Sequence, residues 1–180
     1  MTPLDRLIQW LRIRKALPHI PHGGRLLDVG CADGALIRAA AGRVREAVGI
    51  DPDAPDIPGL VRGSFPSDLR DLGPYDVIAL LAVFEHVPDA QRPAFVAACR
   101  RLLRPGGRVV VTVPAPLVDR IVDLLRRLRL VHGMDIDAHH GYQPGETPGY
   151  FEAVGMRLVR HEPFELGLNH LFVFELPAAS

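Results

Sequence analysis

The sequence has little of what marks several common classes of protein. Its two cysteines, Cys31 and Cys99, give neither a disulfide framework nor the paired spacing of a zinc site. No apolar run approaches the roughly 20 residues that span a membrane, and the N-terminus lacks the uninterrupted apolar segment of a signal peptide. These absences argue against a disulfide-rich or membrane-spanning protein, and we expect a cytoplasmic location.

An excess of charge of either sign is also missing. The 21 Lys and Arg residues balance the 21 Asp and Glu residues, which argues against general attraction to nucleic acid or to an anionic membrane. Locally the charge balance changes. Residues 100–129 are strongly basic, whereas the charged side chains of residues 135–152 are all acidic and are accompanied by histidines. We interpret the basic run as a solvated helix face. The preference for arginine over lysine is typical of a bacterium with a GC-rich genome.

The sequence lacks the signatures of several enzyme classes. It has no G-x-S-x-G nucleophile turn, no phosphate-binding P-loop and no H-E-x-x-H zinc helix. It has neither an N-P-P-Y segment, which would point to an amide or adenine nitrogen as acceptor, nor an appended nucleic-acid-binding domain. With 180 residues, 48% of them hydrophobic, we expect one domain over residues 1–180 with a core on both faces of a sheet.

The most informative segment is residues 25–34, an apolar strand that ends in a glycine turn. Gly30 lets the backbone turn tightly beside a ligand, and Gly34 removes a side chain where the next helix begins. A helix so placed aims free N–H groups at the carboxylate of a ligand. A second predicted strand, residues 44–50, ends at Asp51, whose carboxylate is placed to accept hydrogen bonds from a ribose diol. Together these signals predict a nucleoside-binding edge.

The glycine spacing discriminates between nucleoside cofactors. A dinucleotide-binding turn needs G-x-G-x-x-G, whereas residues 28–34 contain D-x-G-x-x-x-G. Asp28, at the end of the strand, would repel a pyrophosphate and attract an ammonium. An NAD-linked oxidoreductase is therefore disfavoured, although it stays an alternative.

This segment resembles the first motif of the class I S-adenosylmethionine-dependent methyltransferases, and further signals follow in that family's order. Residues 75–81 resemble its fourth strand, residues 84–87 the loop after that strand, and residues 103–108 the turn into its fifth strand. The similarity to the small bacterial methyltransferases of the type 11-like family extends from about residue 25 to residue 175. It implies a Rossmann-like, doubly wound α/β fold with a seven-stranded sheet. The implied strand order is 3-2-1-4-5-7-6, mostly parallel with an antiparallel last strand.

One crossover departs from the family. Residues 51–58 contain three prolines, so the helix between strands two and three should be reduced. Elsewhere hydrophobic periodicity and the family order predict the remaining elements. The expected helices cover residues 3–16, 34–41, 88–103, 116–130 and 147–154, and the expected strands cover 26–29, 44–50, 60–63, 75–81, 109–113, 157–164 and 168–175.

The resemblance implies S-adenosylmethionine as the cofactor. Asp51 matches the family's ribose-binding acid. Ser64 and Phe65 stand where the family often has an acidic residue near the adenine amino group, and we expect a hydrogen bond and an apolar contact from them instead. The residues predicted to bind the cofactor are Asp28, Gly30, Cys31, Gly34, Asp51, Pro52, Ser64, Phe65, Ala82 and Glu85.

Histidines are the candidate catalytic residues. Methyl transfer from a sulfonium needs an in-line nucleophile and a pocket that excludes water, and only some acceptors need a base. His86 is the first candidate base because it follows the fourth strand at the carboxyl edge of the sheet. His139 and His140 are the second, in residues 131–148, a segment that the family uses to cover its substrate. For each histidine the alternative is a loop residue without a catalytic role.

The same segment contains a candidate metal site. Asp135 and Asp137, together with His139 and His140, have a spacing that can converge on one cation. The rest of the pattern of metal-dependent methyltransferases is missing, so we predict no metal.

The predicted function is transfer of the methyl group of S-adenosylmethionine to a small-molecule acceptor, with oxygen as the expected atom. The helix within residues 1–18 either packs against the sheet or covers the active site. Its basic residues would then meet an acidic or phosphorylated acceptor; they are Arg6, Arg12, Arg14 and Lys15. We expect no nucleic-acid partner. The alternative from another class is a cofactor-binding interaction module without catalysis.

Overall fold

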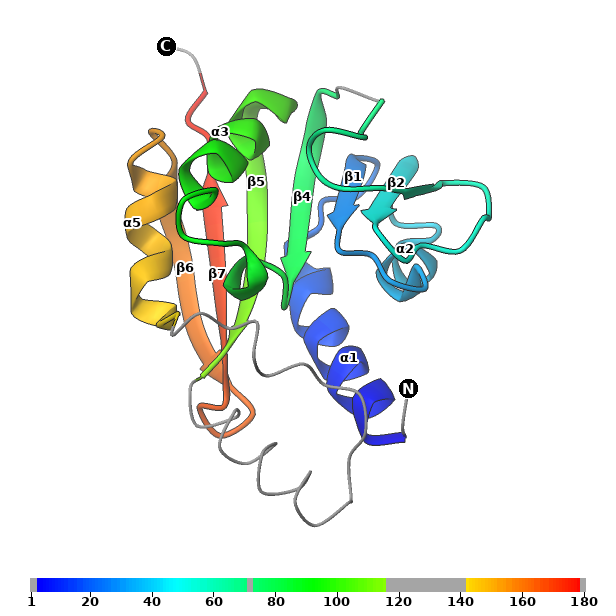
Figure 1. Cartoon of the computed structure of the whole chain (residues 1–180), viewed down its shortest axis with the longest axis horizontal. Helices are drawn as coiled ribbons and strands as arrows, with labels where there is room; N and C mark the ends of the chain where they lie inside the picture. The colour runs from blue at the N-terminus through cyan, green and yellow to red at the C-terminus, as the bar shows by residue number, and fades with distance from the viewer. Residues whose placement is uncertain (1–2, 71–72, 116–141, 179–180) are drawn as a thin grey trace.

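The computed structural model describes residues 3–70, 73–115 and 142–178, and its centre is one seven-stranded sheet (Figure 1). The strand order is β3-β2-β1-β4-β5-β7-β6. Strands β1 to β5 are parallel, and β7 is antiparallel to both of its neighbours, β5 and β6. The predicted fold class is therefore confirmed. The strands are β1 Arg25–Val29, β2 Glu46–Asp51, β3 Leu60–Arg62, β4 Tyr75–Leu81, β5 Leu103–Pro114, β6 Arg157–Phe164 and β7 Asn169–Glu175.

Helices cover both faces of the sheet. Helices α1 and α2 lie on one face, and α3 and α5 lie on the other (Figure 1). Short 3₁₀ turns connect some of the elements. The helices are α1 Pro3–Ala16, α2 Ala35–Ala40, α3 Arg92–Leu102 and α5 Thr147–Glu152, and the 3₁₀ turns are η1 Leu17–His19, η2 Phe84–His86 and η3 Pro144–Glu146.

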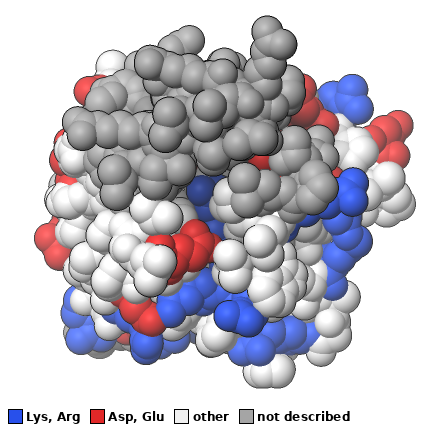
Figure 2. Space-filling view, turned by 90° about the horizontal axis from the view of Figure 1, so that it is seen from below, with Lys and Arg blue, Asp and Glu red and all other residues white. Residues whose placement is uncertain are grey.

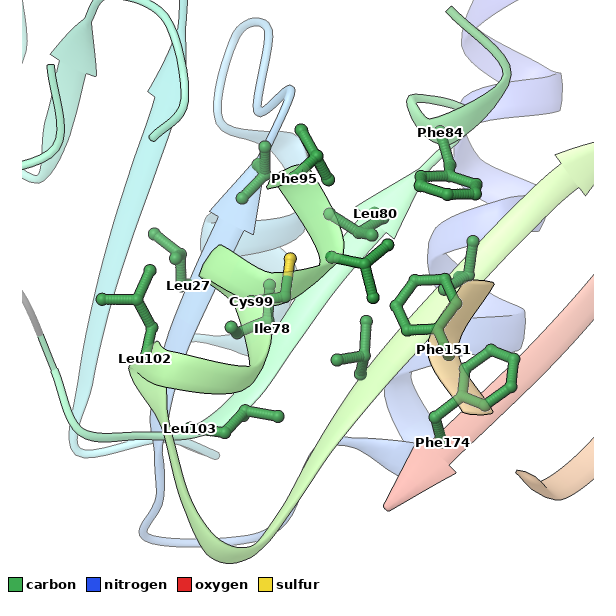
Figure 3. Close-up of a cluster of buried hydrophobic side chains, with 14 of the residues drawn as sticks. Leu27, Ile78, Leu80, Phe84, Phe95, Cys99, Leu102, Leu103, Phe151 and Phe174 are labelled. Carbon is green, nitrogen blue, oxygen red and sulfur yellow. The ribbon is translucent and has the colours of Figure 1, made fainter. Parts of the chain in front are cut away.

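Neighbouring residues of the central strands point to opposite layers. In β4, Val77 and Ala79 pack with α1 and α2, whereas Ile78 and Leu80 pack with α3 and α5 (Figure 3). Because both faces are covered, residues of both orientations must be apolar. This requirement explains why the central strands have unbroken apolar runs instead of the alternation of a half-exposed sheet.

The crossover from β2 to β3 contains no helix in residues 52–59, all of which the structure describes. The prolines remove backbone donors and fix the chain in turns. The segment is anchored instead by Ala54, which is buried and whose carbonyl accepts a hydrogen bond from Arg62 Nε at 2.8 Å. The reduced crossover predicted from the prolines is confirmed.

Strand β5 begins earlier than predicted, at Leu103 instead of residue 109. The reason is a pair of backbone hydrogen bonds with the end of the chain. Gly106 N donates to Leu176 O at 2.8 Å, and Leu176 N donates to Gly107 O at 2.9 Å. The predicted glycine turn is therefore part of the sheet.

Helix α3 begins later than predicted, at Arg92 instead of residue 88. Residues 88–91 form a turn in which Gln91 N and Arg92 N donate to Pro88 O at 2.8 and 3.1 Å. The predicted helix over residues 116–130 and the first part of the predicted 131–148 loop lie outside the described residues. Within the described ranges, no helix is both long and apolar enough to cross a bilayer.

The aromatic packing under α5 predicts a large stability effect. Phe151 is fully buried and stacks on Phe174 with 4.4 Å between ring centroids. Phe151→Ala should lower the free energy of unfolding by about 3–5 kcal/mol, because it removes buried surface and leaves a cavity. Equilibrium denaturation with urea measures this loss. Val159→Ala is the control, since its side chain is 41% exposed, and it should change stability by less than about 0.5 kcal/mol; equal losses in the two variants would contradict this description of the core.

Candidate functional site

The candidate site lies where the strand order reverses, between β1 and β4. Doubly wound sheets bind ligands at the carboxyl ends of the strands at this point. The turns that leave both strands are unusual, because Ala32 has a φ of +46° and Ala82 a φ of +56°. Non-glycine residues adopt such angles rarely, and they gather at ligand sites. The angle at Ala82 is held by hydrogen bonds from its N–H to Thr112 O at 2.9 Å and to Thr112 Oγ1 at 3.1 Å.

Gly30 brings these two turns into contact. Its φ is +73°, and a Cβ at this position would overlap Cγ2 of Val83, in the turn after β4. Gly30 is thus required both by the backbone angle and by the neighbouring loop. The turn after β1 is also tied to β2, because Gly30 N donates to Ile50 O at 2.8 Å.

Asp51 is held in place by the backbone of the same turn. Its Oδ2 accepts a hydrogen bond from Ala32 N at 3.0 Å, and its Oδ1 accepts one from Asp53 N at 2.8 Å. The carboxylate is therefore oriented before any ligand binds, and each oxygen keeps a further lone pair. Pro52, which follows Asp51, is exposed.

Asp28 adds a buried carboxyl group to this edge. Its side chain is 3% exposed, and burial raises its pKa to about 8, with the negative charges of Asp51 and Asp33 acting in the same direction. A cation next to Asp28 would offset both effects. The electrostatics of the site thus favour a positively charged ligand and disfavour a pyrophosphate.

The start of α2 differs from the prediction. Its first N–H, at Ala35, donates to Asp33 Oδ1 at 3.2 Å, and α2 has only 6 residues. Gly34, with a φ of +78°, precedes it, and its N–H donates to Cys31 O at 2.7 Å. The prediction of free N–H groups aimed at a ligand carboxylate is therefore wrong for Gly34 and Ala35, because local acceptors already use them.

Cys31 contributes packing and backbone rather than thiol chemistry. Burial raises the pKa of its thiol to about 12, so the reactive thiolate is not formed near neutral pH. The side chain faces Gly49, where a Cβ would lie 2.7 Å from Cys31 Sγ. Cys31 therefore fixes the spacing between β1 and β2 behind the turn.

An acidic side chain missed by sequence reasoning lies at the end of β3. Ser64 is exposed, and its N–H donates to Asp68 Oδ2 at 2.8 Å. Phe65 packs edge to face on Phe95, with 4.8 Å between ring centroids. Asp68 thus returns a carboxylate to the place where the family often has an acid directly after the strand. Asp68 lies four residues beyond Ser64 in sequence, and the S-F-P-S-D turn is the signal that marks it.

The loop after β4 points its two polar residues in different directions. Glu85 is buried, and its charge acts on Arg12 and on Tyr142. His86 is exposed, and its backbone N–H donates to Val83 O at 3.0 Å. Glu85, predicted as a cofactor ligand, therefore faces α1 and Tyr142. The other candidate catalytic residues, His139 and His140, and the acidic residues of the candidate metal site lie outside the described residues.

A partly buried polar cluster completes the carboxyl edge. Arg12 Nε donates to Asn169 Oδ1 at 3.3 Å, and Asn169 Nδ2 donates to Glu165 Oε2. Burial lowers the pKa of Arg12, while the charges of Glu85 and Glu165 oppose this effect. We name Arg12, Glu85, Glu165 and Asn169 the edge cluster. Sequence reasoning found neither Glu165 nor Asn169, because no motif marks residues that meet only through β6–β7 pairing.

A second cation, Arg92, packs against the aromatic residues that follow residue 141. The Arg92 side chain is buried, with its guanidinium carbon 4.3 Å from the ring centroid of Tyr142 and 5.7 Å from that of Tyr150. It also pairs with Asp89 at 2.5 Å. Tyr142 Oη and Thr147 Oγ1 share a hydrogen bond of 2.5 Å. These contacts anchor the segment after residue 141 to α3.

Comparison with known proteins agrees with this geometry. Residues 5–161 match a family model described as a methyltransferase domain. The ubiquinone biosynthesis O-methyltransferase of Xylella fastidiosa is 38% identical over 166 residues, which cover 79% of this chain and 66% of that protein. That of Acinetobacter baylyi is 27% identical over 155 residues, with coverages of 76% and 64%. The chain thus spans slightly less than two thirds of the length of these relatives.

Solved structures share the fold. A SAM-dependent methyltransferase from Archaeoglobus fulgidus superposes with a TM-score of 0.73 at 15% identity, covering 93% of this chain and 94% of that chain. A Burkholderia thailandensis 1,6-didemethyltoxoflavin-N1-methyltransferase, solved with bound 1,6-didemethyltoxoflavin and S-adenosylhomocysteine, has a TM-score of 0.71 at 14% identity, with coverages of 97% and 80%. At these identities the likeness shows the fold alone.

The buried carboxyl of Asp28 predicts a pH-dependent stability. The folded-state pKa of about 8 lies above the ordinary value of 3.8 for an aspartate, so the folded protein keeps a proton that the unfolded chain loses. Stability therefore falls as pH rises from about 4 to about 8. Asp28→Asn should remove this slope, and its melting temperature should exceed that of the original protein by more at pH 8 than at pH 5.

Thermal melting at the two pH values measures this difference. Asp56→Asn is the matched control, because Asp56 is exposed and is not one of the charges that raise the pKa of Asp28. It should give no gain at pH 8. A gain from Asp28→Asn that is the same at both pH values would contradict a buried, protonated carboxyl.

The family of the chain follows from independent observations. The strand order and the antiparallel β7 match the fold that the sequence motifs implied. The family model covers most of the chain, and the structural neighbours share the same architecture. The chain therefore belongs to the class I S-adenosylmethionine-dependent methyltransferases.

Proposed function

We propose that residues 1–180 act as one methyltransferase domain that transfers the methyl group of S-adenosylmethionine to an oxygen atom of a small-molecule acceptor. The observation that carries the proposal is the oriented carboxylate of Asp51, held by Ala32 N at the point where the strand order reverses. Oxygen as the acceptor atom is supported by the O-methyltransferases among the relatives. When bound, the cofactor supplies a methyl group already activated on a sulfonium.

The charges of the site fit this cofactor. S-adenosylmethionine carries an ammonium and a sulfonium against one carboxylate, and the site carries the carboxyl groups of Asp28, Asp33 and Asp51 around the first turn. Asp51 would accept hydrogen bonds from the ribose hydroxyls, and Asp28 would lie toward the ammonium. The turn residues Gly30, Cys31 and Ala82 would contact the cofactor through their backbone atoms.

The end of β3 would hold the adenine. Phe65 offers an apolar ring already braced by Phe95, and Ser64 offers its hydroxyl and backbone. Asp68 brings a carboxylate beside Ser64 N, so it would accept a hydrogen bond from the adenine amino group. In this proposal Asp68 provides the acidic group that is missing directly after β3.

The edge cluster would receive the acceptor. Arg12 provides a positive charge at the carboxyl edge, and Asn169 and Glu165 provide fixed polar partners. Arg12 would bind an acidic substituent beside the reactive hydroxyl of the acceptor, and Asn169 and Glu165 would bind a hydrogen-bonding one. The hydroxyl proton needs a base if the acceptor is weakly acidic. His86 is the candidate base within the described residues, and His139 and His140 remain candidates in the segment beyond them.

Removal of the Asp51 carboxylate should weaken cofactor binding. Charged hydrogen bonds contribute roughly 1.5–3 kcal/mol each, and about 1.4 kcal/mol is tenfold in affinity. Asp51→Ala should therefore weaken S-adenosylhomocysteine at least about tenfold in titration calorimetry. Asp53→Ala, which removes an exposed carboxylate from the same turn, should leave affinity nearly unchanged. Equal affinity of all three proteins would remove Asp51 from the binding site.

Transfer itself is tested with a methyl-labelled cofactor. We expect label to appear in members of a panel of phenols, catechols and phenolic acids. Arg12→Gln should lower kcat/KM by about tenfold or more, because a charged hydrogen bond is lost, while S-adenosylhomocysteine affinity stays the same. Arg6→Gln is the control on the exposed side of α1. Tight cofactor binding without labelling of any acceptor, in the panel or in a metabolite extract, would instead support the interaction module.

A further inference from the structure

Helix α1 presents an exposed apolar face. Leu7 is 51% exposed and Trp10 is 50% exposed. Residues three, four and seven positions apart share one side of a helix, so Leu7, Trp10, Leu11 and Arg14 are aligned. We name this alignment, together with Arg6 beside Trp10, the α1 strip.

The opposite side of α1 accounts for its packing. Ile13 and Ala16 are buried in the core on the α1 side of the sheet. Arg12, between the two sides, reaches Asn169 in the edge cluster. The α1 strip is therefore not needed to attach the helix, and its two large apolar side chains remain in contact with solvent.

Two cations of the α1 strip have no ion-pair partner within residues 3–70, 73–115 and 142–178. Arg14 lies over the Trp10 ring, with 4.7 Å from its guanidinium carbon to the ring centroid. Arg6 and Arg14 are exposed, and neither forms an ion pair with any residue that the structure describes. Lys15 is different, because Glu162 pairs with it. The strip thus combines Trp and Leu with two positive charges.

The position of the α1 strip relates it to the acceptor side. The N-terminal part of α1 extends past the carboxyl ends of β4 and β5 (Figure 1). Figure 2 views the molecule from this end, and Lys and Arg side chains gather on the part of it away from the grey residues. A shallow pocket of about 190 Å³ adjoins the strip; it is lined by Leu11, Arg14, Lys15, Phe164 and Glu165.

We propose that the α1 strip docks on the surface of an anionic lipid bilayer, with Trp10 and Leu7 at the level of the headgroups and Arg6 and Arg14 on lipid phosphates. Helices with Trp and Leu flanked by arginine bind such surfaces without spanning them. The zero net charge of the chain does not oppose this, because attraction falls off within a Debye length and depends on local charge. Docking goes beyond methyl transfer: it brings the end of the molecule that holds the edge cluster to the membrane.

A second copy of the chain is a weaker occupant. The strip offers only Leu7, Trp10 and part of Leu11, which is little area against the roughly 800 Å² per partner of a stable interface. In a two-fold dimer through this face the same patch meets itself. Arg6 and Arg14 of both copies would then be brought together and would repel each other. On an anionic bilayer the same arginines face lipid phosphates of opposite charge.

Trp10 makes the test direct, because it is the one tryptophan in the sequence. Its emission should shift to shorter wavelength when the protein is titrated with vesicles of equal parts phosphatidylglycerol and phosphatidylcholine at low salt. Vesicles of phosphatidylcholine alone should give little shift, and added salt should reverse it. Each basic residue near an anionic surface contributes about fivefold in partitioning. Arg6→Gln with Arg14→Gln should therefore weaken vesicle binding about 25-fold.

Arg101→Gln is the matched control, since this arginine is exposed on α3, on the other face of the sheet. It should leave vesicle binding unchanged. The proposal is overturned if anionic vesicles leave the Trp10 emission and protein sedimentation unchanged, or if Arg101→Gln weakens binding as much as the paired variant does. A concentration-dependent emission shift without vesicles, accompanied by a dimer in sedimentation velocity, would assign the strip to a second copy. Methyl transfer to a water-soluble acceptor is measured without vesicles, so none of these outcomes bears on the proposed function.

Discussion

The contact between the turn after β1 and the turn after β4 is the constraint on which the candidate site depends. Gly30 meets Val83 where any Cβ would overlap it, so the two turns can close on each other only with glycine at this position. This closure places Ala32 N against Asp51. The cofactor edge is therefore built by backbone geometry, and the ribose-binding acid is oriented before a ligand arrives.

The same edge lowers the stability of the folded protein when no ligand is bound. Asp28 is buried, and burial together with Asp51 and Asp33 raises its pKa to about 8. The folded protein keeps a proton that its unfolded chain releases, and a cationic ligand would reverse this penalty. A site that is unfavourable when empty and favourable around a positive charge fits a sulfonium cofactor better than a dinucleotide. This match connects the D-x-G-x-x-x-G spacing to the choice of cofactor.

The sequence predicted the fold well and the acceptor side poorly. The resemblance to the family predicted β4 at its observed bounds, and the prolines of residues 51–58 predicted the reduced crossover. Asn169 and Glu165 could not be found, because they meet Arg12 only through sheet pairing. The N–H of Ala35 was wrongly predicted to be free, since the competing acceptor Asp33 is itself part of the motif.

We propose that S-adenosylmethionine binds at the carboxyl ends of β1, β2 and β4 with its reactive end toward the edge cluster. A crystal structure with S-adenosylhomocysteine would show this arrangement. We expect ribose hydroxyls on Asp51, adenine between Phe65 and Ser64, and the sulfur toward Arg12 and Asn169. Ligand density elsewhere on the protein, or a ribose that makes no contact with Asp51, would rule out this binding mode.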